Sequence, residues 1–326
     1  MSFQKNTPFP SGVILDLSIV IPLYNEDESL PELTAWIHKV MVENNFSYEI
    51  VFVDDGSTDN SWEVIQNLKK EFAQIKAIKF QRNYGKSAGL NEGFKMASGK
   101  VVVTMDADLQ DSPDELPELY KMIVEDGYDL VSGWKKKRYD SKLAKNIPSK
   151  LFNAVTSKMS GIKLNDFNCG LKAYKLKVIK SVEVYGEMHR YIPVMAKAAG
   201  FRKIGEKVVQ HRARKYGVSK FGWERFVNGF LDLMTVQFIG KFGKKPMHFF
   251  GLIGSLLFLV GFLTTIYLVF CKIFVTDFAI SNRPPFYIAL TCIIIGSIFF
   301  TTGFLAELTL RNSSERNNYL IDETIQ

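Results

Sequence analysis

The sequence predicts an α/β domain built on a mostly parallel sheet, followed by two helices that cross a membrane. Over the N-terminal two thirds of the chain, short apolar segments rich in β-branched residues alternate with segments of helical character. This alternation is typical of a parallel sheet covered by helices on both faces. Two later segments, residues 249–270 and 286–305, contain no charged residue. At about 1.5 Å per residue, each is long enough to span a hydrocarbon core of about 30 Å.

The central strand of the predicted sheet lies in residues 101–111, which read VVVTMDADLQD. Its apolar residues end abruptly in Asp106 and Asp108, as expected of a buried parallel strand that delivers polar groups to the ligand-binding edge of a sheet. On an extended segment, two carboxylates two residues apart point to one side and could share a hard cation with a diphosphate. The alternative is a plain turn, with Ser112 as a helix N-cap and Glu115 closing a capping box.

The other elements follow from the same pattern. Strands are expected over residues 17–22, 48–53, 75–80, 128–133 and 201–211, with a short strand after residues 168–170. Helices are expected from a cap at Asn25 through residue 40, and over residues 60–72, 114–125, 142–159, 191–200 and 223–242. A further helix opens at Gly85, and its N-terminus could attract phosphate.

The corners after the first two strands each have two interpretations. Residues 25–28, Asn-Glu-Asp-Glu, form either part of a binding site or only a helix cap. Residues 54–59, DDGSTD, again place carboxylates at the end of a strand, although Asp59 could simply cap the next helix. Both corners are therefore candidates for ligand contacts at the carboxyl edge of the sheet.

The net charge of +7 is concentrated in two basic clusters. The first contains Lys135, Lys136, Lys137, Arg138, Lys142, Lys145 and Lys150, and the second contains Arg202, Lys203, Lys207, Arg212, Arg214, Lys215 and Lys220. Such clusters are typical of solvated faces or of contacts with a membrane surface, and no nucleic-acid-binding motif accompanies them, so we expect no nucleic-acid partner. The three cysteines are odd in number and far apart, which suggests neither a disulfide framework nor a zinc site.

The chain is expected to divide into four parts. Residues 1–222 form a cytoplasmic domain, because the first residues lack the apolar core of a signal peptide. Residues 223–248 form an amphipathic helix in the membrane interface, or alternatively an ordinary core-facing helix. Residues 249–306 hold the two spans, and residues 307–326 form a polar tail.

The distribution of basic residues predicts the orientation of the two spans. Lys241, Lys244 and Lys245 precede the first span, and Arg311 and Arg316 follow the second. Only Lys272 and Arg283 lie in the connection between the spans. Because short loops rich in lysine and arginine stay in the cytoplasm, both termini should face the cytoplasm and the protein should reside in the cytoplasmic membrane.

Four motifs occur in order along the chain. They are residues 22–26 (PLYNE), 54–59 (DDGSTD), 106–110 (DADLQ) and 214–220 (RKYGVSK). Together they resemble the motifs of family 2 glycosyltransferases of the GT-A fold, a Rossmann-like α/β fold. The match is closest to the polyprenyl-phosphate branch, which comprises dolichol-phosphate mannose synthases and bacterial bactoprenol glucosyl transferases with two C-terminal spans.

The resemblance implies roles for individual residues. Asp106, Asp108 and Gln110 take the catalytic position, with Asp106 and Asp108 binding Mg²⁺ or Mn²⁺ on the donor diphosphate. The donor-binding residues are Pro22, Tyr24, Glu26, Asp55 and Arg214. The residues implied for the acceptor phosphate are Lys135, Lys150 and Lys220. Lysine stands at position 135 where the family has arginine, which removes bidentate phosphate binding there.

The resemblance also implies an activity, which is transfer of a sugar from a nucleotide sugar to undecaprenyl phosphate by single displacement with inversion. A UDP-hexose is the preferred donor and GDP-mannose the alternative, and the product would be a lipid-linked sugar for cell-surface glycan. A polyprenyl phosphate is already largely ionised near pH 7, its second pKa being about 6, so it needs no strong protein base. We also expect a homo-oligomer.

Two other functions remain open at this point. A processive polysaccharide synthase would carry a Gln-x-x-Arg-Trp motif, and residues 210–214, QHRAR, lack its Arg-Trp pair. A catalytically silent membrane scaffold would retain the sugar-nucleotide domain, and the presence of Asp106, Asp108 and Arg214 argues against such decay. Hydrolysis of the donor that depends on Asp108 would separate an enzyme from a scaffold.

Overall fold

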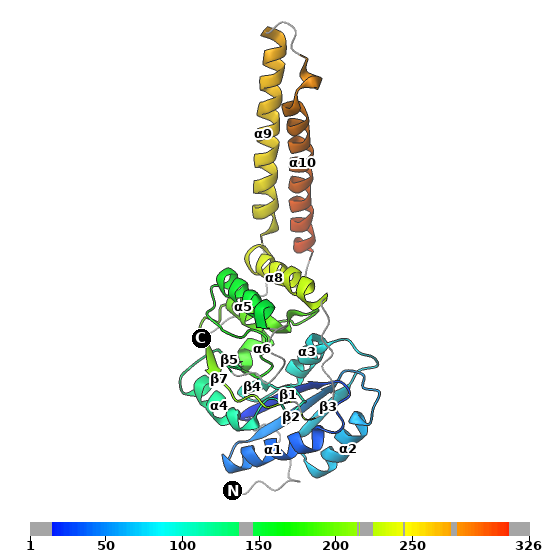
Figure 1. Cartoon of the computed structure of the whole chain (residues 1–326), viewed down its shortest axis with the longest axis vertical. Helices are drawn as coiled ribbons and strands as arrows, with labels where there is room; N and C mark the ends of the chain where they lie inside the picture. The colour runs from blue at the N-terminus through cyan, green and yellow to red at the C-terminus, as the bar shows by residue number, and fades with distance from the viewer. Residues whose placement is uncertain are drawn as a thin grey trace. The chain divides into compact units, whose positions relative to one another are not determined.

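The computed structural model of the chain describes residues 15–136, 146–213, 215, 224–243, 245–274 and 279–312, with the side chains of 146–152 and 224–230 excepted. The chain divides into two compact units, Met1–Gln237 and Phe238–Gln326. The first unit is an α/β domain and the second contains two long helices (Figure 1).

The α/β domain is built on a seven-stranded sheet with the order β3-β2-β1-β4-β6-β5-β7. The strands are β1 (Leu17–Leu23), β2 (Tyr48–Asp54), β3 (Ile75–Lys79), β4 (Val101–Thr104), β5 (Leu130–Trp134), β6 (Lys172–Lys175) and β7 (Ile204–Val208). All pairs are parallel except those of β6, which runs antiparallel between β4 and β5. The predicted mostly parallel sheet is confirmed, and β6 is the strand that joins its two parts.

Helices cover both faces of the sheet. The helices that precede the two long ones are α1 (Leu30–Glu43), α2 (Ser61–Glu71), α3 (Lys86–Met96), α4 (Leu116–Val124), α5 (Asn146–Ser160), α6 (Leu176–Lys180), α7 (Ile192–Ala198) and α8 (Glu224–Phe242), with short 3₁₀ turns η1 (Pro113–Glu115) and η2 (Met188–Arg190). Strand alternation creates two cores: Val101 and Val103 of β4 pack with α1, α2 and α4, whereas Val102 packs with α3, α6 and α7. Both faces of β4 are therefore buried, which explains its uninterrupted apolar sequence.

Helix α3 lies unusually close to the sheet. A Cβ at Gly93 would come within 2.3 Å of Cγ1 of Val20 on β1. Glycine at this position thus permits the contact that brings the N-terminus of α3, with Lys86, to the carboxyl edge of β4.

Two local predictions about turns are wrong, and a third is confirmed in position only. Helix α1 begins at Leu30 with Ser29 as its cap, and Asn25 instead adopts a left-handed conformation with φ of 57°. Ser112 stands at the predicted N-cap position, directly before η1, but it makes no side-chain capping hydrogen bond. The carboxylate of Glu115 is used elsewhere, because it accepts a hydrogen bond from the backbone N–H of Gln210 (2.9 Å) and pairs with Lys207.

The Asp106–Asp108 segment is also not extended. Strand β4 ends at Thr104, and the chain then turns, with Leu109 at a φ of 61°. The two carboxylates therefore lie on a turn, and their placement does not follow from the alternation of a strand. Residues with positive φ other than glycine are uncommon and strained, and they tend to occur at functional sites.

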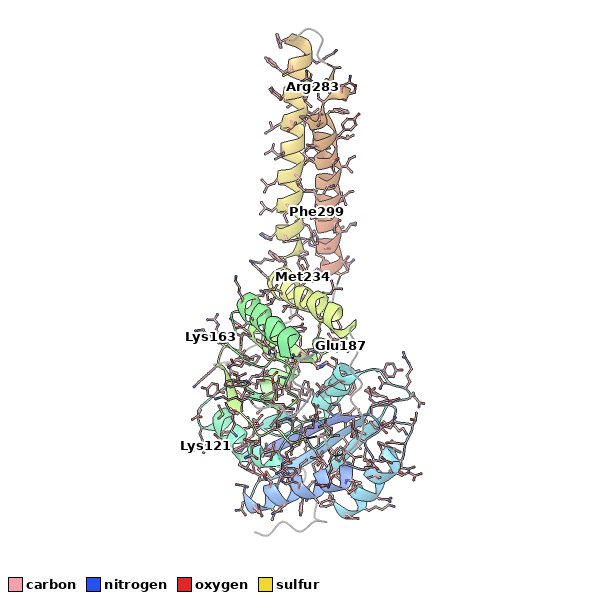
Figure 2. All side chains as sticks on the ribbon, in the orientation of Figure 1. Lys121, Lys163, Glu187, Met234, Arg283 and Phe299 are labelled. Atoms are coloured by element: carbon pink, nitrogen blue, oxygen red, sulfur yellow. The ribbon has the colours of Figure 1, made fainter. Side chains whose placement is uncertain are left out.

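The second unit contains α9 (Pro246–Phe274) and α10 (Pro284–Arg311), both long and apolar enough to cross a membrane. Only 17% of the most apolar window of each helix is buried, and their apolar side chains point outward along both helices (Figure 2). The two helices approach closely at small residues: a Cβ at Gly254 would lie 2.7 Å from the carbonyl oxygen of Gly296. Small residues at such contacts are typical of helix packing in a membrane.

Candidate active site

The candidate active site forms where the chain turns after β4. The carboxylate of Asp106 pairs with the ammonium of Lys86, the first residue of α3. Gly170, at the end of the loop before β6, faces the same carboxylate so closely that a Cβ there would lie 2.4 Å from Oδ2 of Asp106. Burial raises the pKa of Asp106, but the nearby Lys86 and Lys135 ammonium groups outweigh it, and the pKa is held well below its usual range. Asp106 is therefore an anion at neutral pH.

Asp108 and Gln110 lie on the same turn. Both are nearly buried, at 7% and 8% exposed, and Oδ1 of Asp108 accepts a hydrogen bond from the backbone N–H of Gln110 (3.1 Å). Within the described part of the chain, Nε2 of Gln110 has no hydrogen-bond partner. A buried amide without a partner costs free energy unless a ligand satisfies it.

These side chains fit a divalent cation shared with a substrate. Carboxylate oxygens are hard ligands, and Mg²⁺ is commonly held by one or two carboxylates together with substrate phosphates. Among the residues that the structure describes, no group of three or more histidine, cysteine, aspartate or glutamate side chains is placed to hold a metal ion. The Asp106 and Asp108 pair therefore suits a cation whose remaining ligands come from a bound diphosphate.

The ends of β1 and β2 are tied together beside this turn. Backbone N–H groups after β1 donate to side chains after β2, from Asn25 to Oγ of Ser57 (2.9 Å) and from Glu26 to Oγ of Ser61 (3.0 Å). Asp59 takes part as well, since Oδ1 accepts a hydrogen bond from the N–H of Ser61 (3.0 Å). Asp59 thus makes a capping contact at the start of α2, and these hydrogen bonds fix the shape of the sheet edge, while ligand binding at the two corners stays a prediction.

Asp55 is held by the segment that leads into α3. Its Oδ1 accepts a hydrogen bond from the N–H of Tyr84 (2.7 Å), and its Oδ2 accepts one from the N–H of Gly85 (2.9 Å). Burial raises the pKa of Asp55, and the two hydrogen bonds oppose that rise. Pro22 lies opposite Val53 in the β1–β2 ladder. Four of the predicted donor-binding residues, Pro22, Tyr24, Glu26 and Asp55, thus lie at or just beyond the carboxyl ends of β1 and β2.

Lys135 lies at the end of β5 and is already paired. Its Nζ is 2.7 Å from Oδ1 of Asp111, and the two side chains are 11% and 0% exposed. Burial lowers the pKa of Lys135, but Asp111 and the other neighbouring anions raise it above its usual range. Lys135 is therefore a buried, permanently charged group close to the catalytic turn.

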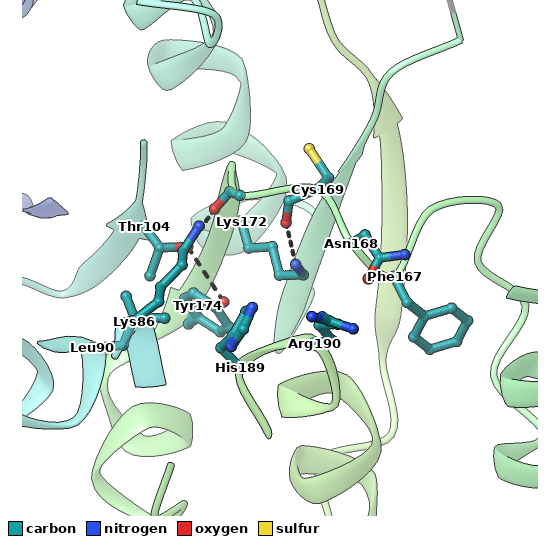
Figure 3. A pocket seen from close by; sticks show the side chains of 11 residues that line it. Lys86, Leu90, Thr104, Phe167, Asn168, Cys169, Lys172, Tyr174, His189 and Arg190 are labelled. Atoms are coloured by element: carbon teal, nitrogen blue, oxygen red, sulfur yellow. Dashed lines mark hydrogen bonds between the residues drawn. The ribbon is translucent and has the colours of Figure 1, made fainter. Parts of the chain in front are cut away.

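A pocket opens next to Asp106 (Figure 3). Its lining residues with basic side chains are Lys86, Lys172, His189 and Arg190. Sequence reasoning singled out only the 85–87 segment of this set. The four come from α3, β6 and η2, spread over more than a hundred positions, so no contiguous motif could reveal them. The antiparallel insertion of β6 is what brings Lys172 to the same space as Lys86.

Three predicted residues cannot be placed in the site. Arg214 and Lys220 lie outside the described residues. Lys150 belongs to α5, whose backbone is described there, but its side chain lies outside the description. Their implied roles stay predictions.

Comparison with known proteins agrees with this arrangement. Residues 18–182 match the family described as glycosyl transferase family 2. Dodecaprenyl-phosphate galacturonate synthase of Rhizobium johnstonii is 36% identical over 302 residues, which cover 91% of this chain and 88% of that protein. Undecaprenyl-phosphate 4-deoxy-4-formamido-L-arabinose transferase of Proteus mirabilis is 33% identical over 313 residues, covering 95% and 94% of the two chains.

Among solved structures, glucosyl-3-phosphoglycerate synthase from Mycobacterium tuberculosis in complex with Mg²⁺ and UDP aligns with a TM-score of 0.52 at 16% identity. The alignment covers 67% of this chain and 79% of that one, and it shows a shared fold. The predicted GT-A fold is thereby confirmed, and the names of both sequence relatives confirm the resemblance to the polyprenyl-phosphate branch. The chain belongs to the family 2 glycosyltransferases.

Proposed function

We propose that this enzyme transfers a sugar from a nucleotide sugar to a membrane polyprenyl phosphate. The observation that carries the proposal is the carboxylate turn at Asp106 and Asp108 next to a pocket lined by basic side chains. This arrangement pairs a site for a metal-bound diphosphate with groups that attract anions. Both relatives are named for a polyprenyl-phosphate acceptor but for different sugars, so their names support the acceptor and leave the sugar to be argued from the site.

The reaction would be a single displacement with inversion at the anomeric carbon. The acceptor phosphate is largely ionised near pH 7 and needs no general base. Burial raises the pKa of Cys169, a thiol among the residues that line the pocket, to about 12, so it stays protonated and is a poor nucleophile. The protein's own contribution is to align the two substrates and to stabilise charge on the departing diphosphate.

Asp106 and Asp108 would hold Mg²⁺ or Mn²⁺ together with the donor diphosphate. The bound cation supplies Lewis-acid stabilisation of the leaving group. Lys86, which pairs with Asp106, is placed to bind the same diphosphate once the carboxylate turns to the cation. The structural neighbour crystallised with Mg²⁺ and UDP supports this choice of metal.

Lys135 would approach the acceptor phosphate while keeping its pairing with Asp111. A lysine ammonium has three donors, and the ion pair with Asp111 leaves others available. Arg214, Lys150 and Lys220 keep the phosphate-binding roles that the family resemblance implies.

The two spans would place the catalytic domain on the cytoplasmic side of the membrane. The basic residues that flank α9 and α10 support this orientation. Helix α8 supports an interfacial position, because Leu233 and Val236 are buried against the domain while Leu231 and Met234 are 55% and 51% exposed. Protease added to sealed inside-out vesicles should digest the α/β domain, and protection of that domain would contradict this topology.

The proposed function is tested with the full chain purified in detergent. Labelled UDP-sugars and GDP-sugars are incubated with undecaprenyl phosphate, with and without EDTA, and the lipid fraction is analysed. We expect one labelled monoglycosyl lipid with inverted configuration, formed only in the presence of a divalent metal. Polymer formation would favour a processive synthase, and absence of any donor consumption would favour a scaffold.

A further inference from the structure

The pocket beside Asp106 is lined by more positive charge than its own protein neighbours neutralise. Its basic residues are Lys86, Lys172, His189 and Arg190, and Figure 3 shows their side chains gathered around one space. Lys86 has the Asp106 carboxylate as its partner. Lys172 and Arg190, in contrast, each have donor groups without an acceptor among the described residues.

Lys172 is a buried ammonium without a carboxylate. The residue is 3% exposed, and its Nζ donates to the backbone carbonyl of Cys169. Within the described part of the chain, no ion pair of Lys172 is present, and two of its three donors are left for other groups. Burial lowers the pKa of Lys172, which is the expected cost of a charge with too few partners.

Arg190 is only partly satisfied as well. The residue is 6% exposed, and its Nη2 lies 2.9 Å from Oε2 of Glu187. Its Nε is buried and, among the described residues, has no hydrogen-bond acceptor. Two deeply buried cations with unused donors in one small pocket indicate that an anion from a ligand completes the site.

The position of the pocket identifies which part of a substrate reaches it. The pocket adjoins Asp106 through Lys86 and Gly170, both of which contact that carboxylate. A donor whose diphosphate lies at Asp106 and Asp108 has its sugar next to this carboxylate, so a small group that projects from the sugar reaches the pocket. A carboxylate fits the donors available there, because guanidinium and ammonium groups form their strongest hydrogen bonds with it.

We propose that the donor is a nucleotide-linked hexuronic acid whose carboxylate binds Lys172 and Arg190. This proposal rests on the proposed function of the same site. A neutral hexose would leave Lys172 without an anionic partner and Nε of Arg190 without a charged acceptor, and the pocket would then discriminate against it.

The test compares donors that differ only at C6. The full chain in detergent is assayed with UDP-glucuronate against UDP-glucose and with UDP-galacturonate against UDP-galactose, using undecaprenyl phosphate as acceptor. At least one uronate should exceed its neutral partner in kcat/KM by about 10-fold or more. Lys172→Met should lower kcat/KM for that uronate by about 10- to 100-fold, as expected when a hydrogen bond to a charged group is lost. It should change the value for the neutral sugar little.

Lys177→Met is the matched control, because Lys177 is exposed on α6, outside the pocket. It should behave as the wild type with every donor, and thermal unfolding of both variants checks that they are folded. Transfer from a neutral hexose but from neither uronate would overturn this proposal and leave the proposed function intact. A rise in KM for undecaprenyl phosphate alone in Lys172→Met would instead assign the pocket to the lipid phosphate and also overturn it. Failure of these four donors would overturn this proposal, and failure of the wider panel of UDP-sugars and GDP-sugars as well would contradict the proposed function itself.

Discussion

Buried charged groups on the two sides of Asp106 differ in sign and in how well the protein provides them with partners. On the side of β1 and β2, buried carboxylates accept several short hydrogen bonds from the protein. Asp54 accepts the N–H of Ser57 (2.7 Å), and Asp55 accepts the N–H groups of Tyr84 and Gly85 (2.7 and 2.9 Å). On the side of β5 and β6, buried ammonium and guanidinium groups line the pocket, and among the described residues Lys172 donates to a backbone carbonyl and makes no ion pair.

The edge at the ends of β1 and β2, which we call the scaffold side, is preformed by the protein. The edge at β5 and β6, which we call the basic side, is completed by a ligand. The carboxylates near β1 and β2 are stabilised by the fold itself, so that edge keeps its shape without substrate. On the other side, among the described residues, Lys172 has no ion pair and Nε of Arg190 has no acceptor, although Nη2 of Arg190 pairs with Glu187, so these donors remain for a substrate anion. Binding energy on the second side can therefore be used to select the substrate.

The largest effect is expected at Asp108, where the two sides meet. Asp108→Asn removes the negative charge that a hard cation requires, so transfer should fall by about 1000-fold or more while the fold persists. Asp126→Asn, an exposed position after α4, is the matched control and should retain activity. Initial rates of sugar transfer at saturating Mg²⁺ or Mn²⁺ test this prediction. Near-normal turnover of Asp108→Asn would contradict the assignment of Asp108 as a metal ligand.

The second effect concerns stability on the basic side. Lys135→Met leaves the fully buried Asp111 without its ion-pair partner, which should lower the free energy of unfolding by about 3 kcal/mol. The double variant Lys135→Met/Asp111→Leu should recover much of that loss, because both charges are then absent. Thermal unfolding of the three proteins measures this coupling. Equal stability of Lys135→Met and the wild type would show that the pair does not stabilise the fold.

A smaller effect is expected on the scaffold side at Asp55. Asp55→Asn replaces one of two accepting oxygens by an amide, so the N–H of Tyr84 or Gly85 loses its acceptor, at about 1 to 3 kcal/mol. The KM for the nucleotide sugar should rise about 10-fold, while the KM for polyprenyl phosphate stays unchanged. A selective rise in the KM for the lipid would contradict the assignment of this edge to the donor.

The smallest effect is a pH dependence that arises from Glu49. Burial raises the pKa of this carboxyl, but Lys76, Ser18 and Ser98 outweigh it and lower the pKa below its ordinary value of 4.5. Between the two pKa values the unfolded state binds more protons, so the free energy of unfolding falls as the pH falls through this window. Glu49→Gln should be less stable near neutral pH and should lose less stability on acidification. Unfolding temperatures from pH 7 to pH 3 test this, and parallel curves would refute it.

The sequence predicted the scaffold side better than the basic side, for a physical reason. Residues 22–26, 54–59 and 106–110 each follow directly after a strand, and parallel strands bring such ends to one edge. Lys172 follows no such rule, because β6 runs antiparallel and presents its beginning, not its end, to that edge. A short strand of unknown direction gives no indication of which of its residues reach the site.

The helix caps predicted at Asn25 and Glu115 also differ from the structure. Asn25 has the composition of a helix cap but adopts a left-handed conformation, because its N–H and its side chain are used to bind the 57–58 segment. Glu115 has the spacing of a capping box, but its carboxylate pairs with Lys207 and accepts a hydrogen bond from the N–H of Gln210, both of which lie more than 90 positions later in the sequence. In both cases a long-range contact outweighs the local preference.

The most direct test of the division between the two sides is equilibrium binding of UDP and of a UDP-hexuronate to the full chain, with Mg²⁺, in detergent. If β1, β2 and Asp108 bind the nucleotide and diphosphate while Lys172 of β6 binds the sugar carboxylate, Asp108→Asn should weaken the binding of both ligands. Lys172→Met should then leave the Kd for UDP within about 2-fold of wild type and raise the Kd for the UDP-hexuronate by about 10-fold or more. An equal loss of affinity for both ligands in Lys172→Met would contradict the account, because it would place Lys172 on the diphosphate and not on the sugar.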